Sequence, residues 1–293
     1  AQVEGRMSRC VGILVCPVCG EPLAEADRTF RCRRGHAFDR AREGYVHLLP
    51  AGHGRSRLKG DASEMVRARR RVLEHGHFEP LAGAIVEAVE RHYAARVDDG
   101  RPFTVVDAGC GEGHYVGRVA AALEDAGACL FGLDISRDAV RLAARAHRDV
   151  TFLVNDLKRK ITIADGAADV VLNVFAPRNA EEFGRVLRPD GLLLVAIPTE
   201  GHLSELREAL PLLEIGAEKR ERTVERLGPR FRLAGEEEIA YRRALTAADV
   251  LDVLRMTPNY WHLDEASLAA AAALGELEVG FAMRLLHFRP AGA

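Results

Sequence analysis

The residues of this chain that are best suited to chemistry follow a short apolar run at 103–106. Asp107 comes directly after that run, and three glycines stand at alternate positions behind it: Gly109, Gly111 and Gly113. A helical pattern begins near Val116. A glycine turn between a buried strand and a helix N-terminus lets backbone N–H groups come close to a ligand, because no side chain stands in the way. These residues predict a site for a nucleotide-like ligand.

A second acid supports this interpretation. The next predicted strand, 129–134, ends in Asp134, about 20 residues beyond the last glycine, where a carboxylate can accept hydrogen bonds from both hydroxyls of a ribose. Dinucleotide sites usually read GxGxxG, whereas this turn reads GxGxG behind an acid. The pattern resembles the first motif of Rossmann-like S-adenosylmethionine (SAM) methyltransferases, and NAD is the alternative ligand. In those enzymes the residues after the third strand contact the adenine, a position that Asn155, Asp156 and Leu157 match here.

Four potential metal ligands lie near the N-terminus: Cys16, Cys19, Cys32 and His36. Two closely spaced thiolates followed by a thiolate and an imidazole form a tetrahedral Cys3His set that is typical of zinc. Buried free thiols or a redox pair are the alternatives. Four ligands leave no open position, so the predicted zinc is structural, and it would supply folding free energy to a segment too small to bury a sufficient core. Cys10 lies outside this spacing, and no role is expected for it.

The metal-binding segment and the loop after it are rich in cations. Concentration of charge in one small module favours phosphate contacts over a merely solvated surface. The glycines of the loop are consistent with a segment that orders on binding RNA. The predicted RNA-binding residues are Arg31, Arg33, Arg34, Arg40, Arg55, Arg57 and Lys59.

Bulk composition limits the other possibilities. The formal net charge is -2, so a nucleic-acid surface must be a local patch. No apolar run approaches the roughly 20 residues that cross a bilayer, and no membrane partner is expected. Six cysteines, three of them clustered, do not suggest a disulfide framework, and the expected location is the cytoplasm.

An α/β scaffold would position these residues. Alternating strand and helix patterns predict a parallel, doubly wound, Rossmann-like sheet with strands near 103–107, 129–134, 150–154, 168–174 and 191–197. Residues 188–191 read as a turn before the fifth strand. The tail adds a helix at 203–215, a strand at 232–242, a helix at 246–256 and a strand at 278–288. The expected parts are a small zinc-ribbon-like domain at 1–50 that binds zinc and recognises RNA, a basic loop and helical linker at 51–98, and a SAM-dependent methyltransferase domain at 99–293.

Taken together, the motifs resemble the RlmA family of 23S ribosomal RNA guanine-N1 methyltransferases, which includes tylosin- and mycinamicin-type macrolide-resistance enzymes. The resemblance covers almost the whole chain, including 43–50, 63–70, 76–81, 109–115, 176–177 and 256–258. It implies SAM and structural zinc as cofactors, 23S rRNA as partner, and a homodimer. The implied activity is methylation of guanine 748 at N1, with macrolide resistance. The alternatives are the housekeeping branch acting on guanine 745, a small-molecule methyltransferase, and an RNA-binding protein that senses SAM without turnover.

The motifs and the resemblance also assign cofactor contacts. Phe78 matches an aromatic position that borders the cofactor, and His202 falls in a loop that closes on the site. Phe175 stands where relatives carry a tyrosine, so no phenol is present there. The predicted cofactor-binding residues are Phe78, Asp107, Gly109, Gly111, Gly113, Tyr115, Val116, Asp134, Ile135, Asn155, Asp156, Leu157 and His202.

Guanine N1 carries a proton, so the transfer needs a base or a proton-accepting water, and charge on O6 must be stabilised. Asn173, at the end of the fourth strand, could donate to O6 or could merely cap the strand. Asp156 and His202 are candidate bases, with an adenine contact and a loop hydrogen bond as their alternatives. The segment 173–177 lacks the Pro-Pro motif of enzymes that methylate exocyclic amines, which favours a ring nitrogen.

Aromatic residues near the predicted site could stack on a base that is splayed out of an RNA loop. Phe175, Tyr260 and Trp261 are the candidates, although core packing is the expected role for each.

Overall fold

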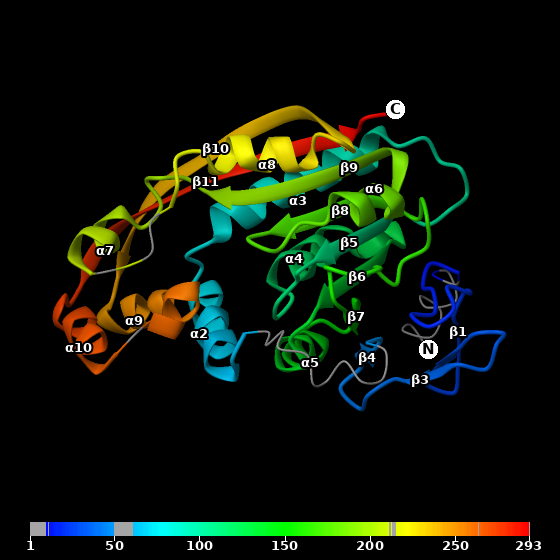
Figure 1. The fold of residues 1–293 in the computed structure, drawn as a ribbon, viewed down its shortest axis with the longest axis horizontal. Coiled ribbons are helices and arrows are strands. Elements are labelled where there is room, and N and C mark those ends of the chain that lie inside the picture. The colour runs from blue at the N-terminus through cyan, green and yellow to red at the C-terminus, as the bar shows by residue number, and fades with distance from the viewer. Residues whose placement is uncertain are drawn as a thin grey trace.

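The computed structural model describes residues 10, 12–49, 61–210, 212, 215–262 and 264–292. Two sheets organise this part of the chain (Figure 1). The small sheet has the order β1-β2-β3 and the large sheet the order β10-β11-β9-β8-β5-β6-β7-β4. Their bounds are β1 (Ala24–Ala26), β2 (Thr29–Arg31), β3 (Ala37–Asp39), β4 (Val46–His47), β5 (Thr104–Ala108), β6 (Cys129–Asp134), β7 (Thr151–Val154), β8 (Ala168–Val174), β9 (Leu187–Pro198), β10 (Phe231–Leu245) and β11 (Leu277–Pro290).

The large sheet is built outward from β5. Strands β6 and β7 follow on one side of β5, and β8 and β9 lie on the other, all parallel. The strand order therefore changes direction between β5 and β8, which makes this position the topological switch point of the sheet. Ligands of such sheets bind beyond the carboxyl ends of the strands at the switch point. The predicted Rossmann-like fold is confirmed, but the sheet is mixed, because β11 runs antiparallel to β9 and β10 antiparallel to β11.

Both faces of the sheet are buried. Because alternate residues of a strand point to opposite sides, neighbouring residues belong to different hydrophobic cores. Val105 belongs to a core covered by α3 (Glu79–Ala95), α4 (His114–Ala122) and α5 (Arg137–Ala146). Val106 belongs to a second core, which contains side chains of α6 (Ala180–Val186) and α8 (Lys219–Leu227) together with those of the N-terminal module. The metal-binding module thus takes the place of a helix against the second face.

The N-terminal and linker segments are integrated into the large domain. Strand β4 pairs in parallel with β7, although it lies before the predicted boundary at residue 50. Helix α3, predicted as part of a linker, buries Leu81 and Ile85 against the sheet. Helix α2 (Ser63–Glu74) packs instead on α9 (Ala247–Arg255). The proposed domain boundaries stay predictions, but the folded contacts cross both of them.

Two segments in the second half of the chain depart from the prediction. The helix expected at 203–215 ends early, as α7 (Ser204–Ala209), because Leu210 is extended before the proline at 211. The turn expected at 188–191 is wrong: β9 runs through these residues, with a shift of register against β8 between Ala168 and Val170. The remaining elements are η3 (Glu124–Ala126), η4 (Pro258–His262) and α10 (Glu265–Ala273). Figure 1 shows β10 and β11 as a long pair that reaches to α7 and α10.

The expectation for Cys10 is wrong. Cys10 forms a disulfide with Cys129, the first residue of β6, across 119 residues of sequence. The chain before the metal-binding module packs against the start of this strand, and a sequence pattern gives no sign of so distant a neighbour. The remaining cysteines, at 16, 19, 32 and 110, are free thiols in the structure.

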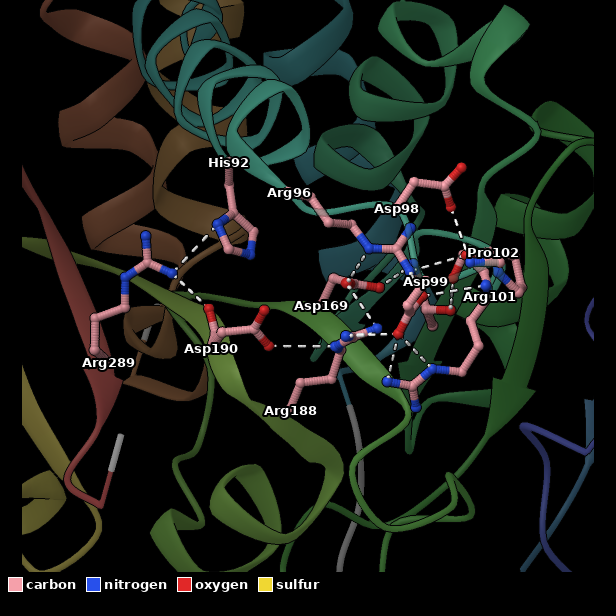
Figure 2. Close-up of polar contacts among 12 residues, drawn as sticks. His92, Arg96, Asp98, Asp99, Arg101, Pro102, Asp169, Arg188, Asp190 and Arg289 are labelled. Atoms are coloured by element: carbon pink, nitrogen blue, oxygen red, sulfur yellow. Dashed lines mark hydrogen bonds and ion pairs between the residues drawn. The ribbon is translucent and has the colours of Figure 1, made fainter.

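A network of charged side chains holds the amino ends of the central strands, at the opposite end of the sheet from the glycine turn (Figure 2). Asp169 of β8 accepts from the Thr104 backbone N–H at 2.8 Å and lies 3.1 Å from Arg96 Nε. Arg188 of β9 lies 2.9 Å from Asp99. These contacts join β5, β8 and β9 to the segment that follows α3.

No helix within the described ranges is long and apolar enough to cross a membrane.

Candidate functional site

The glycine turn lies at the carboxyl end of β5 and wraps around the end of β6. The backbone N–H groups of Gly109 and Cys110 both donate to Leu133 O, at 2.8 and 3.0 Å. The Gly111 N–H donates to Asp134 Oδ2 at 3.0 Å, and the Ser136 N–H to Asp134 Oδ1 at 2.8 Å. All three glycines of the motif have positive φ, and the third is the N-cap of α4. Asp134 therefore anchors the turn in addition to its predicted role at the ribose.

Replacing Gly109 by alanine is expected to abolish measurable cofactor binding. Its φ is +94°, and an added Cβ would lie 2.3 Å from Ala176 Cβ, so the turn and the loop after β8 could not both keep their places. Gly83, in α3, is a matched control because an added Cβ meets no atom within 4 Å. Calorimetric titration with SAM should show parent-like binding for Gly83→Ala. Parent-like binding by Gly109→Ala would contradict the proposed cradle.

Buried acidic side chains gather beside this turn. Neither carboxylate oxygen of Asp107 has a well-aligned hydrogen-bond partner among the described residues, although the side chain is only 1% exposed. Burial and the neighbouring Asp134 raise the pKa of Asp107 to about 8 against a smaller opposing effect of the Val116 N–H. Burial raises the pKa of Glu112 to about 7, although Arg69 opposes the shift. Buried acids that the protein's own donors do not fully satisfy are suited to a ligand that carries positive charge.

The segment after β7 closes one side of the site. The Asn155 N–H donates to Asp134 O at 2.9 Å, and its side-chain amide donates to Thr162 Oγ1 at 3.2 Å. The buried carboxylate of Asp156 accepts from the Lys158 N–H at 2.9 Å. The three predicted adenine contacts, Asn155, Asp156 and Leu157, therefore lie directly beside the predicted ribose acid.

Asn173 cannot donate to a substrate as the sequence suggested. Its Nδ2 donates to Ala108 O and to Pro177 O, both at 3.0 Å, so both amide hydrogens are used within the protein. Its Oδ1 is buried and lacks a hydrogen-bond partner in the described part of the chain. Asn173 is thus an oriented acceptor between the ends of β5 and β8.

Aromatic rings form the other wall of the site. The Phe78 ring centroid lies 6.0 Å from that of Phe175 and 6.1 Å from that of His202. Phe281 of β11, which the sequence did not indicate, packs edge-on against Phe78 at 5.3 Å. Phe175 has a positive φ of 52° and is 43% exposed, so the expected core packing is wrong for this ring.

His202 is a poor candidate for the base. Burial, with the nearby cations Arg207 and Lys219, lowers its pKa to about 3. The ring is therefore neutral near pH 7, and so low a pKa makes it a weak base. Its Nδ1 accepts from the Ala282 N–H at 3.3 Å, so the alternative role in loop structure is the one that the geometry shows.

The four predicted zinc ligands converge on one point. Cys16 Sγ and Cys32 Sγ lie 3.5 and 3.4 Å from His36 Nδ1, and Cys19 Sγ lies 3.7 Å from Cys32 Sγ. Tetrahedral zinc with ordinary ligand bonds requires separations of about 3.6 Å between sulfur and nitrogen and about 3.8 Å between sulfurs. The arrangement therefore fits a closed, structural zinc site. Two tight turns with left-handed glycines, Gly20 and Gly35, hold the two halves.

Comparison with known proteins identifies the family. A model described as RlmA, N-terminal, matches residues 14–57, and a methyltransferase domain model matches residues 105–191. The 23S rRNA (guanine(748)-N(1))-methyltransferase of Streptomyces fradiae is 43% identical over 263 residues, covering 90% of this chain and 91% of that protein. The chain belongs to the 23S rRNA (guanine-N1)-methyltransferase family.

Two further likenesses accompany this match. A candidate 23S rRNA (guanine-N1)-methyltransferase of Micromonospora griseorubida is 43% identical and covers 94% of this chain and 97% of that protein. Among solved structures, a SAM-dependent methyltransferase of Thiobacillus denitrificans in complex with S-adenosyl-L-homocysteine is 15% identical, with a TM-score of 0.44, and covers 71% of this chain and 91% of that one.

The cofactors of this methyltransferase are SAM and structural zinc, and the residues present fit both. The orphaned carboxylate of Asp107 and the raised pKa of Glu112 mark a site in which acidic groups outnumber the cations that act on them. SAM carries a sulfonium and an ammonium group, which would supply that charge. The glycine turn follows the carboxyl end of β5, and Asp134 lies at the end of the adjacent strand.

Binding of SAM to this methyltransferase is expected to release a proton. With a pKa of about 8, Asp107 is mostly protonated at pH 7, and a cationic ligand favours its ionised form. Affinity should therefore rise with pH toward about 8 and level off above it. Calorimetry at pH 7 in buffers of different ionisation enthalpy measures the released protons directly. Binding enthalpies that do not depend on the buffer would contradict this assignment.

A second cluster of possible metal ligands is better explained as a hydrogen-bonded cap. His75, His77 and Asp249 offer ligand atoms within 4.8 Å of one another. However, His75 Nδ1 lies only 2.6 Å from Asp249 Oδ1, which is closer than two ligands of one ion would stand. The other oxygen of Asp249 completes a capping box with Thr246 at the start of α9. We assign this cluster to the joint between α2 and α9.

The predicted RNA-binding arginines divide into two groups. Arg31 and Arg33 are exposed and make no ion pair with any residue that the structure describes. Arg34 is exposed and lies 3.9 Å from Glu21. Arg40 instead donates to both carboxylate oxygens of Glu25, at 2.7 and 2.8 Å, and stacks over the Phe30 ring, so its contacts are structural. Arg55, Arg57 and Lys59 lie outside the described residues.

The remaining stacking candidates lie on η4. Trp261 is 58% exposed, so core packing is wrong for this residue, and its ring packs edge-on against Tyr260 at 5.1 Å. Tyr260 donates to Glu64 Oε2 at 3.2 Å and so joins η4 to α2.

Sequence reasoning did not identify Arg69, Glu112 or Phe281 as site residues. Only Glu112 had a local signal, because it lies within the glycine motif.

Proposed function

We propose that this methyltransferase modifies N1 of guanine 748 in 23S rRNA. The identity to the Streptomyces fradiae enzyme over nine-tenths of both chains carries the proposal. The oriented acceptor Asn173, beside a turn suited to SAM, is consistent with a ring nitrogen as target. SAM supplies an activated methyl group, so the protein has to align the nucleophile with it and manage one proton.

In this proposal, Asn173 positions the guanine that is methylated. Its Oδ1 accepts from the exocyclic amine of guanine, because the opposite side of the amide is held by two backbone carbonyls, and this leaves the N1–H free to be removed. An amide oxygen cannot take the proton, so an ionised group or a water molecule must do so. Asp156, a buried carboxylate in the segment that closes one side of the site, is the group that we propose for this step, because His202 Nδ1 already accepts from the Ala282 N–H.

Recognition of the RNA is proposed to divide between two parts of the chain. The exposed Arg31 and Arg33 of the zinc module contact phosphates, while Phe175 stacks on the target base at the site. A homodimer, a cytoplasmic location and a role in macrolide resistance are part of the proposal, and they rest on the family resemblance.

Mass mapping of modified nucleotides tests the substrate assignment. Ribosomal RNA from cells that lack the protein would be incubated with the purified enzyme and SAM, and the expected product is 1-methylguanine at position 748. Methylation at a neighbouring guanine would overturn the position, and labelled metabolites without labelled RNA would overturn the substrate class. SAM binding without transfer to either would support the sensing alternative.

Phe175→Ala is expected to slow methyl transfer by roughly 10-fold while the affinity for SAM changes little. Stacking of a base on an aromatic side chain contributes about 1–3 kcal/mol. Single-turnover rates with rRNA and calorimetry with SAM separate the two effects. Val97→Ala is the control, because Val97 is also an exposed apolar residue but lies after α3, away from the site. An unchanged rate for Phe175→Ala would remove this ring from the proposal.

A further inference from the structure

Arg69 brings a positive charge to the glycine turn from outside the sheet domain. It lies on α2, and its Nη1 is 3.6 Å from the position that a Cβ would take at Gly111. Its other terminal nitrogen, Nη2, is held by Asp61 Oδ2 at 2.5 Å and by Met256 O at 3.0 Å. No described residue accepts a hydrogen bond from Nη1. The guanidinium is thus fixed on one side and leaves a donor facing the cofactor turn.

The charges around Arg69 define what this donor can bind. The side chains of Asp107, Glu112 and Asp134 gather at the same turn, and they suit the sulfonium and ammonium groups of SAM. The amino-acid end of SAM also carries a carboxylate, which these acids would repel. Arg69 acts on both Glu112 and Asp134, whereas Arg70 has a smaller effect on Glu112 alone and pairs with Glu74 on the same helix.

We propose that Arg69 binds the carboxylate of the amino-acid end of SAM through Nη1, with Asp61 and Met256 O holding the guanidinium in position. Helix α2, which the sequence places in a linker, is then part of the cofactor site. The surrounding acids outweigh the effect of burial and raise the pKa of Arg69, so the group stays charged at any working pH. A charged donor to a carboxylate is among the stronger hydrogen bonds in proteins. This proposal needs the SAM site but does not depend on which guanine is methylated.

Two ligands that differ only in the carboxylate test the proposal without RNA. SAM and decarboxylated SAM would be titrated calorimetrically into the parent protein and into Arg69→Ala. Loss of one charged hydrogen bond should weaken SAM binding by roughly 10- to 100-fold and leave decarboxylated SAM nearly unchanged. Arg69→Lys should recover part of the affinity for SAM. Arg70→Ala, the neighbouring arginine on the same helix, is the matched control and should bind both ligands like the parent.

The pattern across the two ligands separates this role from a structural one. Equal weakening of both ligands would show that Arg69 only supports the fold of the turn, and it would overturn the proposal. Parent-like binding of SAM by Arg69→Ala would overturn it as well. Binding of decarboxylated SAM shows whether the site of the Arg69→Ala protein is intact. A loss of affinity for SAM alone therefore cannot come from unfolding. Failure to methylate guanine 748 would contradict the proposed function and leave this result untouched.

Discussion

Replacement of Asp134 by alanine should weaken SAM binding by roughly 100-fold or more. The carboxylate accepts from the Gly111 and Ser136 backbone N–H groups, at 3.0 and 2.8 Å, so its loss frees the middle of the glycine turn. It also removes the predicted partner of the ribose hydroxyls. Hydrogen bonds to charged groups contribute about 1.5–3 kcal/mol each, and about 2.7 kcal/mol corresponds to 100-fold in affinity. Calorimetric titration measures the dissociation constant.

Asp134→Asn and Asp125→Ala complete this experiment. The asparagine keeps one oxygen for the Gly111 N–H but loses the charge and half of the ribose contact, so an intermediate affinity is expected. Asp125 lies exposed in η3, and its replacement should have no effect. An Asp134→Ala protein that bound SAM like the parent would show that neither the turn nor the ribose depends on this carboxylate.

His36→Ala should remove the zinc, lower the melting temperature by about 10 °C and abolish tight rRNA binding. Zinc supplies most of the folding free energy of a module this small. Because the module covers one face of the large sheet, its loss also exposes core side chains such as Phe131 and Leu153. For a domain of this size, about 1 kcal/mol corresponds to roughly 2–4 °C. Metal analysis, thermal unfolding and filter binding of rRNA are the measurements.

SAM binding measured well below the melting temperature should survive in His36→Ala, since the glycine turn contains no residue of the zinc module. His47→Ala is the matched control, because His47 is an exposed histidine of β4 that is not part of the metal-ligand cluster. Retention of one zinc per chain and of full RNA affinity by His36→Ala would disprove the role proposed for the module.

Local patterns were sufficient for much of the fold and of the cofactor site. The apolar runs that end in Asp107 and Asp134 became β5 and β6, and the alternate glycines took positive φ as the motif requires. The spacing of Cys16, Cys19, Cys32 and His36 predicted a cluster whose atoms do converge. In each case, residues close in sequence determine the geometry.

The features that sequence reasoning missed depend on contacts between distant segments. Arg69 reaches Gly111 because α2 docks on α9, which begins about 180 residues later. The disulfide of Cys10 and the parallel pairing of β4 with β7 are equally remote. Asn173 lies at the end of its strand as expected, but the direction of its hydrogen bonds is set by the carbonyls of Ala108, on the neighbouring strand, and of Pro177.

The parallel pairing of β4 with β7 also has a practical consequence for work on the isolated catalytic domain. An uncovered strand offers unsatisfied backbone groups to other molecules, and proteins protect such strands with charge or with a short covering strand. At one margin of the sheet, β10 carries Glu236, Glu237 and Glu238 in exposed positions. At the other, two residues of β4 provide the protection. A truncated protein that starts after residue 50 would lose this cover, and we expect it to self-associate through β7 and to precipitate on concentration.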